Sequence, residues 1–290
     1  MLIVFNPTAG SRRQQRLERA LSALRAQGVP AEIAMTEYAG HAETIARDAA
    51  RAGQRVVVAA GGDGTIAEVA SGLAGSDTTL GVLPLGTANV LACELGLPLA
   101  PEGAAMVLAK GRTAVLRPGM AHFADGRVRL FLQMLGAGFD AAVVAGLSLP
   151  LKRQFGRGAY VWQSARELTR YAFPRITAWI DGEPLAAASV VVSKGRFYGG
   201  RYMLAPDALP GAEGFQVVLF RWSGPLAAAC YGAALPLNLL PRLSGVQIRH
   251  GGSIRLEAPA TCAQTDGDPA GTLPVDIADA PGPLRMLLAP

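Results

Sequence analysis

Short apolar runs alternate with amphipathic stretches over the first 110 residues of the chain. The apolar runs are typical of buried strands, and the stretches between them place leucines and alanines at helical spacing among arginines. We expect strands at residues 2–5, 31–35, 56–60 and 81–85, and helices at 12–27, 41–52, 66–73, 89–95 and 102–108. This alternation predicts an α/β domain with a Rossmann-like parallel sheet and helices on both of its faces.

After residue 112 the helical period gives way to short apolar or alternating runs, several of them beside Asp-Gly turns. So many short strands with turn signals favour an antiparallel sandwich. We expect strands at 113–116, 120–123, 127–134, 175–180, 189–193, 215–220, 246–249 and 253–258. The predicted organisation is an α/β domain at 1–112 and an all-β sandwich domain at 113–290, with the tail at 281–290 packing back on the first domain.

The apolar stretch at 224–240 is interrupted by Pro225, Pro236 and Asn238, so it favours a buried or interfacial helix over a membrane span. The apolar start at residues 2–5 is too short for the core of a signal peptide. We therefore expect a cytoplasmic protein with at most peripheral contact at the inner face of the membrane.

Arginine dominates the positive charge, since only three of the 27 basic residues are lysine and the net charge is +5. Guanidinium groups bind phosphate oxygens well, which suits a phosphate ligand or an anionic membrane surface. Nucleic acid is disfavoured because the basic residues are scattered and aromatic residues make up only 6% of the chain. The three cysteines, an odd number, argue against a disulfide framework.

A β-branched run at residues 56–60 stops in Gly61-Gly62-Asp63-Gly64-Thr65 and then leads into a helix. Glycines let backbone amides approach a ligand closely, and the start of a helix favours an anion, so this turn predicts a phosphate site. It differs from a Walker loop and from the dinucleotide fingerprint. Asp63 is suited to hold Mg²⁺ on a nucleotide; the alternative is that it only caps the helix.

Similar turns of glycine, hydroxyl and amide residues follow the neighbouring predicted strands, at residues 6–10, at Thr36 and at 86–89. Ligands of parallel sheets bind outside the carboxyl ends of the strands. We therefore expect these turns to converge on one nucleotide site.

Two further stretches carry candidate chemistry. The turn Thr265-Asp266-Gly267-Asp268 places two carboxylates where one could accept a proton from an attacking hydroxyl, although most Asp-Gly turns are only hairpins. The loop at 147–157 joins apolar side chains to a basic cluster, which fits an anionic membrane surface or, equally, a buried helix start with a solvated end.

Together these motifs resemble the diacylglycerol kinase catalytic-domain family, which includes sphingosine kinases and small bacterial lipid kinases. The resemblance rests on Asn6-Pro7-Thr8-Ala9-Gly10, on Gly61-Gly62-Asp63-Gly64-Thr65, on the run from Leu83 to Asn89, on Gly199-Gly200 before Ala205-Pro206-Asp207-Ala208, and on Asp266-Gly267-Asp268. It implies an α/β nucleotide domain, a β-sandwich lipid domain, and transfer of the γ-phosphoryl group of ATP to a lipid alcohol such as diacylglycerol, with ATP and Mg²⁺ as cofactors.

The resemblance also implies which residues bind and react. The proton acceptor falls at Asp268, with Asp266 alongside and Asp63 in a catalytic role. Because Asp268 stands where the family has Glu, either carboxylate could be the base. The nucleotide is placed against Asn6, Pro7, Gly10, Thr36, Ala60, Gly61, Gly62, Asp63, Gly64, Thr65, Ile66, Gly86, Thr87 and Asn89.

A second departure concerns the loop at residues 209–215. The bacterial lipid kinases that the chain resembles bind a structural Mg²⁺ there through an Asp and neighbouring carbonyl groups, but Ala212 falls at the position of that Asp. If Glu213 takes its role, Leu209 and Glu213 would hold the ion.

Two other functions stay open at this point. NAD kinase shares the Gly-Gly-Asp-Gly turn and the two-domain plan but phosphorylates a soluble nucleotide. A lipid- or nucleotide-binding module without catalysis would fit the altered positions at Ala212 and Asp268. The sequence does not choose among lipid acceptors.

Overall fold

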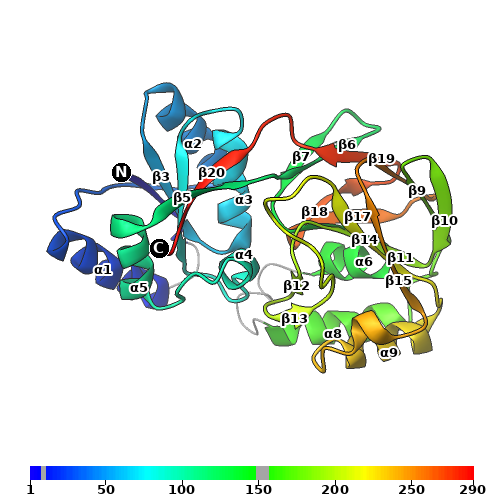
Figure 1. Cartoon of the computed structure of the whole chain (residues 1–290). Coiled ribbons are helices and arrows are strands. Elements are labelled where there is room, and N and C mark those ends of the chain that lie inside the picture. Colours follow the sequence, from blue (N-terminus) through cyan, green and yellow to red (C-terminus); the bar gives the residue numbers. More distant parts are fainter. Residues whose placement is uncertain (8–10, 148–156) are drawn as a thin grey trace. The chain divides into compact units, whose positions relative to one another are not determined.

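The computed structural model describes residues 1–7, 11–147 and 157–290. These residues form two compact units, Met1–Arg117 with Pro281–Pro290, and Pro118–Ala280 (Figure 1). Gly10 and nearly all of the basic loop expected at 147–157 lie outside the described residues.

The first unit is the expected α/β domain (Figure 1). Its strands run in the order β2-β1-β3-β4-β20-β5, and neighbouring strands from β2 to β20 are parallel. Helix α1 packs against α5 and α2 packs against α3. The elements are β1 (Leu2–Phe5), α1 (Ser11–Ala26), β2 (Glu32–Met35), α2 (His41–Arg51), β3 (Val56–Gly61), α3 (Asp63–Leu73), β4 (Thr79–Pro84), α4 (Val90–Glu94), α5 (Pro101–Lys110), β5 (Arg112–Leu116) and β20 (Leu284–Leu288).

The last strand returns to the first unit and makes its sheet mixed. β20 pairs in parallel with β4 and antiparallel with β5, and Met286 at its centre is fully buried. The sequence placed residues 113–116 in the second domain. They belong to the first unit because β5 pairs with β20, so the division lies at Arg117 and Pro118.

The second unit is the expected antiparallel sandwich, with strand orders β10-β9-β16-β19-β6-β7 and β15-β14-β11-β8-β17-β18 in its two large sheets. A pair of short strands, β12 and β13, stands apart. The strands are β6 (Gly119–Phe123), β7 (Val128–Phe131), β8 (Met134–Ala137), β9 (Ile176–Ile180), β10 (Glu183–Ala187), β11 (Ser189–Ser193), β12 (Phe197–Tyr198), β13 (Tyr202–Met203), β14 (Phe215–Phe220), β15 (Val246–Gly251), β16 (Ile254–Glu257), β17 (Cys262–Thr265), β18 (Asp268–Thr272) and β19 (Val275–Asp279).

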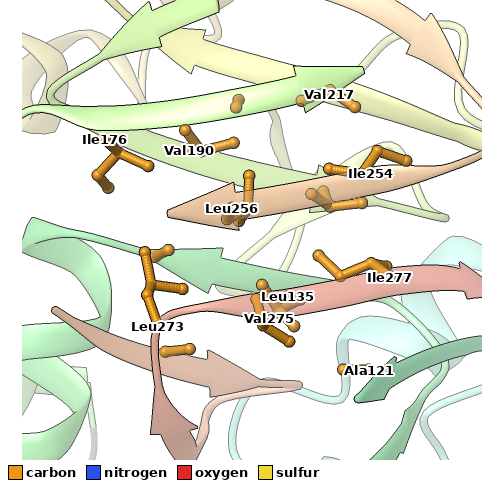
Figure 2. Close-up of a cluster of buried hydrophobic side chains, with 14 of the residues drawn as sticks. Ala121, Leu135, Ile176, Val190, Val217, Ile254, Leu256, Leu273, Val275 and Ile277 are labelled. Carbon is orange, nitrogen blue, oxygen red and sulfur yellow. The ribbon is translucent and has the colours of Figure 1, made fainter. Parts of the chain in front are cut away.

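The core of this unit lies between the two large sheets. Alternating apolar residues of both sheets meet there, as Figure 2 shows for Val190 and Val217 of one sheet and Ile254, Leu256 and Ile277 of the other. Each of these five side chains is at most 2% exposed. Alternation along the strands therefore buries one face of each sheet, as the sequence pattern predicts.

Helices accompany the sandwich at α6 (Phe139–Gly146), α8 (Arg157–Leu168), α9 (Pro225–Ala234) and the short 3₁₀ helix η1 (Leu240–Arg242). Helix α9 buries Tyr231 and Ala234 against Val191 and Val218 on the outer face of the β11–β14 sheet. No helix within the described parts of the chain is long and apolar enough to span a bilayer. The stretch at 224–240 thus contains a helix, α9, of which Tyr231 and Ala234 are buried.

Candidate functional site

Three of the expected turns are joined by hydrogen bonds at the carboxyl ends of β1, β2 and β3. The backbone amide of Asn6 donates to the carbonyl of Ala60 at 3.2 Å, and its side-chain amide donates to Oγ1 of Thr65 at 3.3 Å. The backbone amide of Thr36, which is buried, donates to the carbonyl of Phe5 at 2.9 Å. The parallel register of the strands places these residues at one edge of the sheet.

The turns after β3 and β4 pack against each other through glycine. A Cβ on Gly86 would lie 2.5 Å from Cα of Gly62 and 2.7 Å from Oδ1 of Asn89, so no larger residue fits without displacing backbone. Asn89 closes its own turn, because Oδ1 accepts the amide of Gly86 at 2.9 Å and Nδ2 donates to the carbonyl of Gly86 at 3.0 Å. Asn89 adopts a positive φ of 48°, which asparagine tolerates better than most residues.

Helix α3 begins at Asp63, directly after these packed glycines, with Gly62 as its N-cap residue. The first amides of a helix have no partner within the helix, so they can donate to an anion. Thr65 and Ile66 are buried, and the amide of Ile66 already bonds to the carbonyl of Gly62. Ile66 and the fully buried Ala60 therefore support the turn by packing, whereas Gly62, Asp63 and Gly64 remain partly exposed.

Asp63 faces the start of another helix. Its Oδ1 accepts the amide of Leu91 at 3.3 Å, and further backbone bonds come from Asn89 and Val90. Burial raises the pKa of the Asp63 carboxyl, and these amides oppose that rise. The carboxylate thus ties the turn after β3 to α4. Asp63 therefore caps the start of α4, whereas the sequence analysis considered a cap on the helix that follows its own turn.

In the second unit, Asp266 and Gly267 form a two-residue hairpin turn between β17 and β18. Both have positive φ, 49° and 88°, as a type I′ turn requires. The Asp266 carboxylate accepts the backbone amides of Leu132, Gln133 and Met134 at 2.7, 2.9 and 2.9 Å. It therefore anchors the connection between β7 and β8. The single strand expected at 127–134 is instead the end-to-end pair β7 and the start of β8.

Asp268 has different surroundings from Asp266, although it is two positions away. It is the first residue of β18, pairs with Thr265 in register, and its side chain is exposed. The hairpin thus holds one carboxylate on backbone amides and presents the other to solvent.

A polar network that the sequence analysis missed lies behind this hairpin. Gln264 donates from Nε2 to Oδ2 of Asp140 at 3.0 Å, while its Oε1 accepts the amide of Gly267 at 2.8 Å. The hydroxyl of Tyr198 donates to the other oxygen of Asp140. Burial raises the pKa of the Asp140 carboxyl despite both donors. The glycines at 136 and 138 were the available signal, since a Cβ on Gly136 would lie 2.5 Å from Oδ2 of Asp140.

The loop expected to hold a structural Mg²⁺ contacts a lysine instead. The side chains of Leu209 and Glu213 are exposed. The Lys194 ammonium donates to the carbonyl oxygens of Ala212 and Gly214 at 3.1 and 2.8 Å, and also to the Asp279 carboxylate. The cation at these oxygens belongs to the chain, so the arrangement does not fit the expected Mg²⁺ site.

Two family models together match most of the chain. The model of the diacylglycerol kinase catalytic domain matches residues 1–121, and that of the YegS C-terminal NAD kinase beta sandwich-like domain matches residues 133–288. A Pseudomonas aeruginosa protein named probable lipid kinase YegS-like is 36% identical over 219 residues, 72% of this chain and 67% of that protein. A protein with the same name from an Enterobacter species is 30% identical over 236 residues, which are 79% of this chain and 76% of that protein.

Solved structures show the same fold. The crystal structure of a protein from Bacillus anthracis covers 100% of this chain and 95% of that protein's chain, with a TM-score of 0.80 at 23% identity. The structure of a diacylglycerol kinase from that organism covers 100% of this chain and 96% of its own, with a TM-score of 0.70 at 20% identity.

Proposed function

The chain belongs to the diacylglycerol kinase catalytic-domain family in its YegS-like form, and on that premise we propose that it is an ATP-dependent lipid kinase. The acceptor is the hydroxyl of a lipid alcohol such as diacylglycerol. The observation that carries the proposal is the pair of packed glycine turns at Gly62 and Gly86, which lies directly before the start of α3, where backbone amides can bind an anion. Nucleotide phosphates suit such a backbone-lined site.

Asp268 of the second unit supplies the proton chemistry in this proposal, and Asp266 beside it has a positioning role. Asp268 accepts the proton of the lipid hydroxyl. At the same time the hydroxyl oxygen bonds to the γ-phosphorus, and the bond between that phosphorus and the leaving oxygen of ADP breaks. Asp266 is a positioning residue, because three backbone amides already bind its carboxylate. A Mg²⁺ ion bound with ATP would neutralise phosphate charge, and Asp63 is the residue that would hold it.

Exposed apolar side chains on and beside the neighbouring helices α8 and α9 (Figure 1) support peripheral contact with an anionic bilayer. Residues 221–250 include Arg221, Arg242 and Arg249 and no acidic residue. Exposed tryptophan and leucine side chains beside arginine are typical of helices that bind at a membrane interface. Trp162 lies on α8 and Leu226, which is 85% exposed, on α9, while the exposed Trp222, Leu237 and Leu239 lie in the segments that flank α9.

Labelled transfer from γ-labelled ATP with Mg²⁺ tests the function. We offer diacylglycerol and other lipid alcohols in mixed micelles, and NAD in a separate reaction. A labelled lipid is the expected result. Labelled NADP would move the chain to the NAD kinase reaction, and ATP binding without a labelled product would favour a non-catalytic module.

The same assay tests whether α9 contacts the membrane. With the acceptor in anionic vesicles, Leu226→Asp should lower the transfer rate relative to the unchanged chain, while detergent-dispersed acceptor should be used equally well by both. Equal rates on vesicles would show that α9 does not contact the membrane. That result would leave the proposed kinase reaction untouched.

A further inference from the structure

We propose that the Lys194 ammonium is a built-in cation that orders the loop at residues 209–214 and replaces a divalent metal ion there. Lys194 follows β11 directly, and its side chain is 0% exposed. A buried ammonium is stable only when its charge is paired and its donors are used.

The partners of Lys194 meet this requirement from several elements. Asp279, the last residue of β19, accepts one hydrogen bond from the ammonium, and the carbonyls of Ala212 and Gly214 accept others. The ammonium also lies 4.3 Å from the ring centroid of Phe215, close enough for a cation–π contact. One side chain thus joins β11, the loop and the end of β19.

Asp279 also binds the loop directly. Its Oδ2 accepts the amide of Gly214 at 2.8 Å, while its Oδ1 accepts Lys194. Gly214 has a positive φ of 71°, so its amide and its carbonyl can both be used in this turn. The loop is consequently closed around a carboxylate and an ammonium that lie within the same chain.

A divalent ion would compete with the lysine for the same oxygens. Mg²⁺ requires oxygen ligands at about 2.0–2.1 Å in near-octahedral geometry. The Ala212 and Gly214 carbonyls instead lie at ordinary N–H···O distances from Nζ, 3.1 and 2.8 Å. To bind there, the ion would have to expel the ammonium or lie beside a like charge, which is unfavourable.

The test uses neither ATP nor a lipid, so it is independent of the proposed function. Hydrogen exchange of peptides covering residues 204–220, together with Tm, is measured for the unchanged chain with EDTA and with millimolar Mg²⁺. We expect the same exchange protection of the loop in both. Protection that falls with EDTA and returns with Mg²⁺ would overturn the proposal.

The matched variants are Lys194→Ala and Lys110→Ala, since Lys110 is exposed at the end of α5. Lys194→Ala should lower Tm by roughly 5–15 °C and abolish protection of the loop, because it leaves Asp279 without its partner. Added propylammonium should restore part of that protection, and propanol should not. Unchanged protection in Lys194→Ala, or equal effects of both variants, would contradict the inference. If Lys194→Ala does not fold, the EDTA measurement decides alone.

Discussion

Two carboxylates of one hairpin have different surroundings because the turn determines where each points. Asp266 occupies the first corner of a type I′ turn with φ of 49°, and its carboxylate reaches the amides at residues 132–134. Asp268 begins β18 and faces solvent. The sequence identified the pair but could not tell the two carboxylates apart, because Asp266 contacts residues about 130 positions earlier.

Asp140 gives a pH test at the residue scale. Burial raises its pKa above the ordinary 3.8, so the carboxyl ionises at a lower pH in the unfolded chain than in the folded one. The stability of the fold therefore falls as pH rises from about 3.8 through the raised pKa. In Asp140→Asn this fall in stability with pH is absent, because the amide does not ionise. Its free energy of unfolding, measured by urea denaturation, should therefore rise relative to that of the unchanged chain as pH increases, by at most about 1.4 kcal/mol per pH unit. A free-energy difference that is flat or falls between pH 4 and 8 would contradict this assignment.

At the scale of elements, the candidate nucleotide site depends on how closely two turns approach. Gly86→Ala would place a Cβ 2.5 Å from Cα of Gly62, and overpacking of this kind costs roughly 1–3 kcal/mol. We expect the dissociation constant for ATP, measured by calorimetry, to rise about tenfold or more, with the far-ultraviolet circular dichroism unchanged.

The control for this variant is Gly232→Ala on α9, where an added Cβ meets no atom within 4 Å. It should bind ATP as the unchanged chain does. Equal affinity in Gly86→Ala would show that the contact between the turns does not shape the nucleotide site.

Strong periodicity made most elements of the first unit predictable. The helices expected at 12–27 and 41–52 are α1 (Ser11–Ala26) and α2 (His41–Arg51). Strands such as β17 and β18 were missed because threonine, glutamine, aspartate and glycine interrupt their apolar pattern. Their pairing comes from β8 and from the turn between them, which only the folded chain supplies.

At the scale of the whole molecule, the sequence predicted two domains with the tail at 281–290 on the first one, but it placed the boundary before β5 rather than after it. β5 reads as the first strand of the sandwich, yet its partner is β20, some 170 residues later. Lys194 was similarly hidden. Lysine is rare in the chain, but nothing local indicates that its ammonium binds the carbonyls of a loop almost 20 residues away.

The central claim is that this family member transfers phosphate from ATP to a lipid hydroxyl with Asp268 as the base. Its most direct test is kcat for labelled transfer to diacylglycerol by the unchanged chain, Asp268→Asn and Asp125→Asn. Asp125 is a matched control because it lies in an exposed Asp-Gly turn and bonds to Arg127. We expect Asp268→Asn to lower kcat by about 10²-fold or more with little change in KM for ATP, and Asp125→Asn to have no effect. Full activity in Asp268→Asn, or no labelled lipid from the unchanged chain, would contradict the account.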